Sequence, residues 1–492
     1  MSISKVLFSF LWVWFLTSNI LLADVRLPKA FTDNAVLQRD TAVKIWGWAD
    51  AGEKVKVTWN GQSAETTACD AGKWSVQIPS GSACCEGKEL VVEGKNKVVL
   101  QNVVVGEVWI CSGQSNMEQP LNSWGQPRLS CTEEEISGDY SFVRFNRAAH
   151  QTADKPAEDV PSNGWTVCKD GNQKNCTACG FHFAVRLHKE LGVPVGLIDV
   201  NWGGSNINSW IPDEGWNNIP ETVETGKTLI ANRQKVENKD KGYHWAGGMY
   251  YAMLAPWRGY TIRGALWYQG CSNAGEGGFY YYKQKAMIQE WRKLWGQGDF
   301  PFYWVQLANF RAPSGGPNED IGWALIRDAQ TRCMDVPNTG QAVIIDIGEE
   351  KDIHPRNKYD VGNRLARWAL AKDYGKEVVY ASPIVREWKV DGNKLIVKFD
   401  QVGSGLVVGE NVERQPLKVI PNGELKRFAI AGEDKVFHWA TAKIVGKDTV
   451  ELSCDAVPNP VAARYAWQQN PLGCNLYSAE GLPATPFRTD AW

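Results

Sequence analysis

The chain has 492 residues, of which 22% are charged and 43% hydrophobic, and its formal net charge is −2 at pH 7. This length is sufficient for two or three domains, each with a hydrophobic core of its own. The balanced charge, without a basic patch or a long run of like charges, argues against nucleic acid as a partner and against a disordered tail.

The first 23 residues are typical of a secretory signal peptide. Lys5 gives a positive start, Val6–Leu16 a short apolar core, and Ala23 a small residue before the expected cleavage point. The apolar run is short for a membrane span, although an uncleaved anchor is the alternative. We therefore expect a mature chain without a membrane partner, either secreted or in a lysosomal or other extracytoplasmic compartment. Asn175–Thr177 is an N-glycosylation sequon, which fits a glycoprotein.

Twelve cysteines suit an oxidising compartment, and we expect disulfides among them. Cys454 with Cys474, both late in the chain, is the pair that we favour most. Cys176 and Cys179 form a single Cys-x-x-Cys without a second one or a spaced histidine pair, so no metal site is expected. Cys111 lies inside an expected strand and is predicted to be a buried free thiol.

Residues 24–104 alternate apolar and polar positions between turn signals, which is typical of strands with one buried face. The expected strands are Val43–Gly47, Val55–Trp59, Trp74–Ile78 and Leu90–Glu93. Asn60-Gly61 predicts a two-residue hairpin turn. We interpret this region as a small antiparallel β-sandwich.

Residues 105–379 alternate short apolar runs with helical patterns, which predicts an α/β region with a parallel sheet. The expected strands are Val108–Cys111, Val195–Val200, Gly264–Tyr268, Phe302–Leu307 and Ala342–Ile347. The expected helices are Phe181–Leu191, Tyr281–Trp295, Trp323–Cys333 and Tyr359–Lys372. Residues 380–492 return to strand alternation, as in Leu395–Phe399 and Thr449–Leu452, and form a C-terminal β-rich region.

The segment Gly106–Glu118 is the most informative part of the chain. Its apolar run stops at Gly113, and Ser115 follows beside an amide side chain, as at a strand end that presents a nucleophile. Glycine permits a sharp turn, and the next backbone N–H groups can face a developing oxyanion. A Gly-x-Ser sequence alone is more often a solvated turn after a buried strand.

Gly113–Met117, preceded by Gly-Glu-Val-Trp-Ile-Cys, closely resembles the serine motif of the sialate O-acetylesterase family, within the esterases named for Ser, Gly, Asn and His. Three further stretches support this resemblance in the required order: Val195–Trp210, Trp267–Asn273 and Asp352–Lys358. The likeness extends over nearly the whole chain after residue 23. It implies an SGNH-hydrolase-like three-layer sandwich with a parallel sheet, flanked by N- and C-terminal β-rich regions.

The resemblance assigns Ser115 as the nucleophile and His354 as its base. An acceptor should orient the second ring nitrogen of His354. Asp352 is the leading candidate, but the wider group usually places its aspartate three residues before the histidine, where this chain has Lys351. Asp346, or a backbone carbonyl, is therefore kept as an alternative.

The oxyanion hole implied by the resemblance consists of the Ser115 backbone N–H, a glycine N–H and the Asn273 side-chain amide. We prefer Gly204 to Gly203 as the glycine donor. Relatives usually carry Gln-Gly-Glu-Ser-Asn in this stretch, and here Cys271 replaces the glutamate, which leaves substrate preference open.

The sequence thus predicts a secreted serine esterase that removes O-acetyl groups from sialic acids through an acetyl-enzyme, without a metal or cofactor. The partner is an O-acetylated sugar or glycan. One alternative is an esterase acting on O-acetylated plant or algal polysaccharide, and another is a non-catalytic carbohydrate-binding protein. Arg356 and Arg263 are candidates to bind a sialic acid carboxylate. The sequence indicates nothing about oligomeric state.

Overall fold

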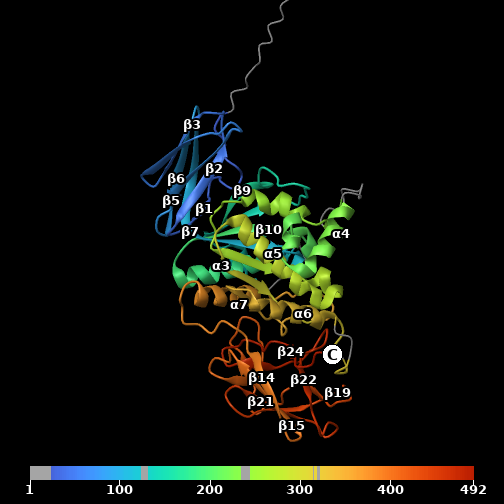
Figure 1. Ribbon diagram of the computed structural model, residues 1–492. Helices are drawn as coiled ribbons and strands as arrows, with labels where there is room; N and C mark the ends of the chain where they lie inside the picture. Colours follow the sequence, from blue (N-terminus) through green and yellow to red (C-terminus); the bar gives the residue numbers. More distant parts are fainter. Residues whose placement is uncertain (1–23, 124–130, 234–243, 314, 319–321) are drawn as a thin grey trace, which may run out of the picture.

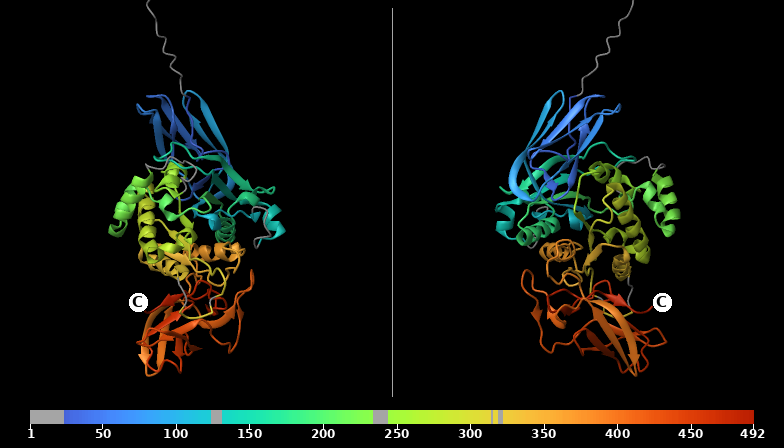
Figure 2. Two further views of the ribbon diagram at one scale, coloured as in Figure 1. Left: turned by 90° about the vertical axis from the view of Figure 1, so that its right-hand side faces the viewer. Right: turned by 60° about the vertical axis from the view of Figure 1, so that its left-hand side comes forward.

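The computed structural model describes residues 24–123, 131–233, 244–313, 315–318 and 322–492. The expected signal peptide, residues 1–23, lies outside the described residues. A β-rich N-terminal region, a central region with helices and a β-rich C-terminal region follow one another along an elongated molecule (Figures 1 and 2). No helix in the described part of the chain has the length and apolar character that crossing a membrane requires.

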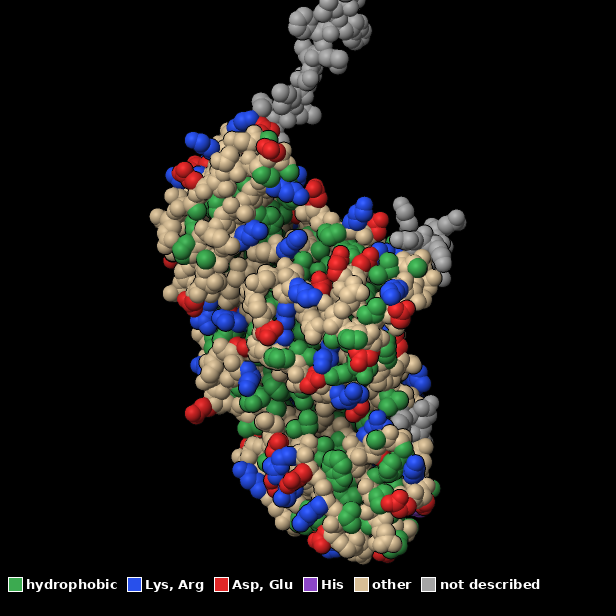
Figure 3. Space-filling model, in the orientation of Figure 1, with side chains coloured by type: hydrophobic (Ala, Val, Ile, Leu, Met, Phe, Trp, Pro, Cys, Tyr) green, Lys and Arg blue, Asp and Glu red, His purple; other side chains and the backbone are tan. Residues whose placement is uncertain are grey.

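Charged side chains are distributed evenly over the visible surface. On the face shown in Figure 3, lysines and arginines are interspersed with aspartates and glutamates over all three regions, in line with the net charge of −2. This face therefore offers no extended field of one sign to a polyelectrolyte.

The N-terminal region contains two antiparallel sheets. One pairs β2 (Ala42–Trp48) with β5 (Lys73–Pro79), and the other joins β3 (Lys54–Trp59), β4 (Gln62–Thr67) and β6 (Cys84–Glu93) to β7 (Lys97–Gly113). The predicted hairpin at Asn60-Gly61 is confirmed: Trp59 pairs with Gln62, and the two turn residues have φ of 48° and 78°.

Strand β7 connects the N-terminal region to the central region without a break. Its first part pairs with β6 and with β1 (Val36–Gln38), and its second part pairs with strands of the central sheet. A boundary drawn between residues 104 and 105 therefore divides one continuous strand of 17 residues. Buried side chains of both regions belong to one hydrophobic core.

The central sheet is mixed, with six parallel strands and one antiparallel edge strand, so the region is α/β. Its order is β13-β12-β11-β7-β10-β8-β9, where only β9 runs antiparallel. The bounds are β13 Thr339–Ala342, β12 Phe302–Val305, β11 Gly264–Tyr268, β10 Val195–Asn201, β8 Tyr140–Ala148 and β9 Ser162–Cys168. Strands β8 and β9 are not among the predicted strands.

Four long helices accompany this sheet where the sequence predicts them. They are α3 Ala178–Leu191, α5 Tyr280–Trp295, α6 Gly322–Arg332 and α7 Lys358–Lys372. Helix α3 ends at Gly192, which has a left-handed φ of 69° and donates its N–H to the His188 carbonyl. Helices α3 and α7 pack closely at Gly362, where an added Cβ would lie 2.7 Å from the Cys179 carbonyl. The described residues form three further helices: α1 Ser115–Glu118, α2 Glu133–Ser137 and α4 Val223–Arg233.

The C-terminal region consists of small antiparallel sheets. One has the order β14 (Ile384–Asp391), β15 (Lys394–Asp400), β21 (Thr449–Ser453) and β20 (Thr441–Ile444). Another has the order β19 (Phe437–Trp439), β18 (Phe428–Ala431), β22 (Ala462–Tyr465) and β24 (Phe487–Arg488). A third joins β17 (Lys418–Val419), β16 (Leu406–Glu410) and β23 (Leu476–Ser478).

The last strand of the parallel sheet was placed wrongly by the sequence. The apolar run Ala342–Ile347 predicts a strand, but β13 covers Thr339–Ala342. Val343 and Ile345 instead pack in the hydrophobic core of the C-terminal region. The run is apolar because it is buried between two regions, which its hydrophobicity alone does not distinguish from a strand.

The expected disulfides are absent. All twelve cysteines are described, and all are free thiols. Cys474 is buried in the C-terminal core, where its Sγ donates to the Ile345 carbonyl at 3.8 Å, and it does not bond to the half-buried Cys454. Cys111 is a buried free thiol, as predicted.

The register of three neighbouring strands brings their carboxyl ends together. Gly113 at the end of β7 pairs with Asn201 at the end of β10 on one side and with Tyr268 at the end of β11 on the other. The connection after β7 leads to β8 on one side of the sheet, whereas the connection after β10 leads to β11 on the other side, and such a switch point in an open sheet is where ligands bind. Gly113 has φ of 143°, and an added Cβ would lie 2.2 Å from the Tyr268 carbonyl oxygen.

We predict that Gly113→Ala lowers the free energy of unfolding by more than about 3 kcal/mol, because it combines strain at positive φ with a backbone clash. The matched control is Gly52→Ala, since Gly52 has φ of 77° but nothing within 4 Å of an added Cβ. Urea unfolding monitored by tryptophan fluorescence should give about 1–2 kcal/mol for this control. Equal losses in the two variants would contradict the tight packing of β7 against β11.

Candidate active site

The predicted site residues all follow the carboxyl ends of central strands. Ser115 follows β7, Gly204 follows β10, Asn273 follows β11, and His354 lies on the segment between β13 and α7. Because β10 and β11 are the two neighbours of β7, three of these segments begin side by side. The fold therefore brings the four sequence motifs to one edge of the sheet.

Ser115, His354 and Asp352 form a chain of hydrogen bonds. Ser115 Oγ lies 2.9 Å from His354 Nε2, and Asp352 Oδ1 lies 3.1 Å from His354 Nδ1. The same Asp352 oxygen accepts the His354 backbone N–H at 2.9 Å. A ring with its proton on Nδ1 donates to Asp352 and leaves Nε2 free to accept the serine proton, which is the order that a triad requires.

The alternative orienting group, Asp346, is engaged elsewhere. Its carboxylate forms a bidentate ion pair with Arg364, with distances of 2.6 and 2.8 Å, and also accepts from the Tyr477 hydroxyl at 3.3 Å. Asp352, two residues before the histidine, reaches the ring because it caps the same short loop. The structure thus places Asp352, and not Asp346, at the imidazole.

The surroundings of His354 favour the neutral imidazole. Burial and then the positive charge of Lys358 lower the pKa of His354 below its ordinary value of 6.5, while Asp352 opposes this shift. A neutral ring can accept a proton, so a lowered pKa keeps the base competent under mildly acidic conditions.

Lys358 has a role that the sequence did not reveal. It is fully buried at the start of α7, and burial lowers its pKa to about 8. Its Nζ donates to Asn116 Oδ1 at 2.5 Å, and the Asn116 amide donates to the Ile353 carbonyl at 3.0 Å. These bonds join the residue after the nucleophile to the residue before His354, so Lys358 positions both.

Glu118 decides which of the two glycines, Gly203 or Gly204, has a backbone N–H available to an oxyanion. Glu118 Oε2 accepts the Gly203 N–H at 2.5 Å, so this N–H is not available to an oxyanion. The Gly204 N–H has no acceptor among the described residues, and neither does the N–H of Ser115, the first residue of α1. Gly204 also has φ of 75°, a conformation that favours glycine. The backbone N–H groups of Ser115 and Gly204, which are the oxyanion donors predicted from the sequence, are thus the two that are available to a substrate.

Asn273 presents an unpaired donor. Its Oδ1 accepts from the Ile207 N–H at 3.0 Å and from the Gln269 amide at 2.7 Å, which fixes the orientation of the side chain. Its Nδ2 group is buried and has no acceptor within the described chain. Since a buried unpaired donor is costly, its retention suits a group that binds charge developing on a substrate.

His150 and Trp202 flank the site and were not predicted. His150 Nε2 lies 2.8 Å from Glu118 Oε1, and its ring stacks on Trp202 at 4.4 Å with an interplanar angle of 6°. Burial opposes ionisation of Glu118, but His150, Arg147 and the Gly203 N–H lower its pKa below the ordinary value. His150 follows β8, whose carboxyl end lies at the same edge of the sheet. Because β8 is not among the strands predicted from the sequence, His150 is not predicted at the site either.

Cys271, at the position where the resemblance implies a glutamate, lies beside the Asn116 side chain and near Lys358. Burial raises the pKa of its thiol to about 12, so it is uncharged at neutral pH. The buried Lys358 side chain therefore has an uncharged thiol near it at this position. Asn116 and the ring of Tyr268, 5.4 Å from Nζ, are its polar surroundings instead.

The two arginines proposed for a sialic acid carboxylate are both paired. Arg263 binds Glu107 at 3.0 Å, at the opposite end of the central part of β7 from Ser115. It therefore does not belong to the site. Arg356 lies two residues from His354 and forms a bidentate ion pair with Glu349, with distances of 3.0 and 2.9 Å.

One group of side chains elsewhere has the composition of a metal site. Ligand atoms of Cys131, Glu135 and His182 lie within 4.8 Å of one another. Arg414, however, donates to both oxygens of Glu135. A guanidinium so close would repel a cation, so the geometry assigns no metal to this cluster.

We predict that kcat/KM falls with decreasing pH along a limb centred below 6.5, because protonation of His354 removes the base. Lys358→Met should move this limb to higher pH, since the charge that lowers the His354 pKa is lost. Asp352→Asn should move it to lower pH and also slow turnover. The pH dependence of kcat/KM for aryl acetate hydrolysis is to be measured for the wild type, Lys358→Met and Asp352→Asn. Lys351→Met, at an exposed lysine of the same loop, is the control. An unmoved limb in Lys358→Met would refute the proposed electrostatic coupling.

Comparison with known proteins identifies the family to which the chain belongs. Residues 105–371, more than half of the chain, match the family model described as "Carbohydrate esterase, sialic acid-specific acetylesterase". The chain is 26% identical to the sialate O-acetylesterase of Homo sapiens, over 94% of this chain and 92% of that protein. It is 26% identical to the enzyme of Mus musculus, over 93% of each.

A solved structure extends the likeness to the whole fold. A carbohydrate acetylesterase from Xanthomonas citri is 35% identical, with a TM-score of 0.83 over 95% of this chain and 100% of that one. The likeness thus includes both β-rich regions as well as the central sheet. The chain is a carboxylic ester hydrolase and belongs to the sialic acid-specific acetylesterase family of carbohydrate esterases.

Proposed function

We propose that this protein removes O-acetyl groups from sialic acids by serine catalysis in an SGNH-type three-layer sandwich. The observation that carries the proposal is the aligned Ser115–His354–Asp352 chain beside an unpaired Asn273 amide. Its relatives named sialate O-acetylesterases supply the substrate class. We further propose that residues 1–23 direct export, so that the enzyme acts in an extracytoplasmic compartment.

In the acylation step, His354 Nε2 takes the Ser115 proton as Oγ attacks the acetyl carbonyl. Asp352 holds the ring in the required tautomer and stabilises the imidazolium that forms. The N–H groups of Ser115 and Gly204 and the Asn273 amide bind the oxyanion of the tetrahedral intermediate. His354 then protonates the departing sugar oxygen, which leaves acetate bound to Ser115 as an ester.

Deacylation reverses these roles with water in place of the sugar. The neutral His354 takes a proton from water, which attacks the acetyl carbonyl while the same three donors hold the oxyanion. Collapse of this intermediate releases acetate and returns the proton to Ser115. The side chains named here suffice for both steps.

A second substrate class has specific support. The relative from Xanthomonas citri is named a carbohydrate acetylesterase, without reference to sialic acid, and is more similar in sequence than the mammalian enzymes. O-acetylated polysaccharide is therefore the second candidate.

We predict that the wild-type enzyme releases acetate from 9-O-acetylated sialic acid and that Ser115→Ala does not, because this variant lacks the nucleophile. Enzymatic determination of acetate measures both. Release from acetylated xylan but not from the sialic acid would overturn the first substrate class in favour of the second. Undiminished release by Ser115→Ala would overturn the mechanism.

We also predict that Asn273→Ala lowers kcat by about 10² to 10³, with a small effect on KM, because its amide acts mainly on the transition state. Asn393→Ala, at an exposed turn of the C-terminal region, is the matched control. Steady-state kinetics on 4-nitrophenyl acetate measure the effect. A loss confined to KM would contradict the role of Asn273 in the oxyanion hole.

A further inference from the structure

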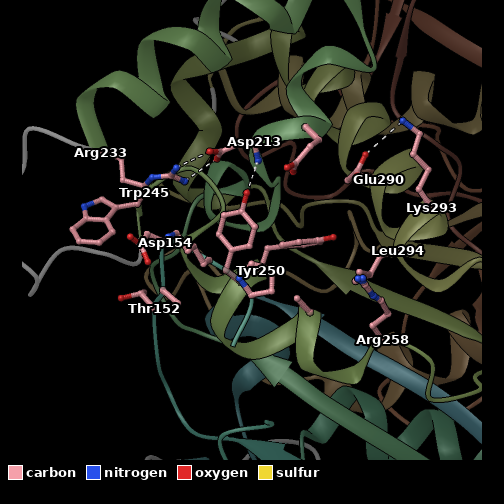
Figure 4. A pocket seen from close by; sticks show the side chains of 16 residues that line it. Thr152, Asp154, Asp213, Arg233, Trp245, Tyr250, Arg258, Glu290, Lys293 and Leu294 are labelled. Carbon is pink, nitrogen blue, oxygen red and sulfur yellow. Dashed lines mark hydrogen bonds and ion pairs between the residues drawn. The ribbon is translucent and has the colours of Figure 1, made fainter. Parts of the chain in front are cut away.

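A cavity of about 1320 Å³ has neither Ser115 nor His354 in its lining (Figure 4). It is lined by residues 152–156 of the segment after β8, by Trp245–Ala255 and by the C-terminal half of α5. Pockets that hold a drug-sized ligand have volumes of roughly 300–1,000 Å³. The cavity therefore has room for more than one sugar ring.

Two segments near the catalytic residues continue along the chain, or through one side-chain contact, to residues that line this cavity. Thr152 lines the cavity two residues after His150, whose ring lies on Trp202 beside Gly203. On another side, Asn206, two residues after Gly204, contacts the ring of His244 at 3.3 Å, and Trp245 follows. A chain of sugars with its acetylated unit at Ser115 could thus continue over Trp202 into the cavity.

Aromatic side chains with available polar groups line the cavity. Figure 4 shows Tyr250 in its middle, with Trp245 on one side and Arg258 and Leu294 on the other. The Tyr250 side chain is 5% exposed, and its hydroxyl has no hydrogen bond to any described residue. Trp245 is partly exposed, and its indole N–H likewise has no acceptor in the described chain.

The charges that line the cavity balance. There are four acidic residues, Asp154, Asp213, Glu214 and Glu290, and four basic ones, Lys155, Arg233, Arg258 and Lys293. Asp213 and Arg233 form a bidentate pair with distances of 2.8 and 2.6 Å, and Glu290 pairs with Lys293 at 3.6 Å. Such a lining favours an uncharged ligand with many hydroxyl groups over a polyanion.

We propose that this cavity binds the neutral sugar units attached to the acetylated sugar, so that the enzyme acts on oligosaccharides in preference to free monosaccharides. This inference rests on the proposed function, because it places the ester at Ser115. Trp245 offers its ring face to a pyranose, and the Tyr250 hydroxyl and the paired charges offer hydrogen bonds to sugar hydroxyls.

Direct binding tests the inference without catalysis. Isothermal titration of the Ser115→Ala protein with 3′-sialyllactose and with xylohexaose should detect binding of at least one of them. Adding Trp245→Ala should weaken this binding about tenfold, and Tyr250→Phe, which removes only a hydroxyl, should weaken it less. Trp388→Ala, at an exposed tryptophan of the C-terminal region (45% exposed), should leave binding unchanged.

Kinetics separate this inference from the proposed function. In Trp245→Ala, the ratio of kcat/KM for 9-O-acetylated sialyllactose to kcat/KM for 4-nitrophenyl acetate should fall about tenfold. Failure to bind either oligosaccharide, or binding that Trp245→Ala and Tyr250→Phe leave unchanged, overturns the inference even if acetylated sialic acid is cleaved. If the enzyme does not cleave 9-O-acetylated sialic acid but the Ser115→Ala protein binds xylohexaose, the proposed substrate is overturned. The inference that the cavity binds sugars is then supported.

Discussion

The active site depends on the register of three parallel strands at Gly113. This residue pairs with the last residues of both β10 and β11, so the three strands end at the same level of the sheet. Gly113 has no Cβ, and the Tyr268 carbonyl occupies the space where a Cβ would lie. The close approach allows the segments with Ser115, Gly204 and Asn273 to meet. A shift of one residue between these strands would separate the nucleophile from its oxyanion donors.

Polar groups around this point are held before a substrate binds. The Asn273 amide is oriented through Gln269, which in turn accepts from the Tyr280 hydroxyl at 2.7 Å. On the other side, Lys358 and Asn116 connect the nucleophile segment to the His354 loop. Asp352 and Lys358 act on the imidazole with opposite sign, and burial together with Lys358 prevails. Such preorganisation is the main source of electrostatic stabilisation in acyl transfer.

Much of this arrangement could be predicted from sequence, because strand ends with glycine and an adjacent nucleophile form short local patterns. The positions of Ser115, Gly204, Asn273 and His354 at one sheet edge follow from such patterns. Other features depend on contacts between distant segments. His150 reaches the site only through β8, whose polar residues hid the strand, and the partner of Asp346 is Arg364 of α7. Likewise, burial of Val343 and Ile345 in a second core displaced the predicted last strand.

The most direct test of the account is to identify the residue that carries the acetyl group during turnover. The wild-type enzyme would be mixed with an acetyl ester, quenched in acid within a single turnover, digested and analysed by mass spectrometry. The account predicts one added acetyl group on Ser115, and none on this residue in His354→Ala. Acetylation of another residue, such as Cys271, or turnover without any acetylated peptide, would contradict it.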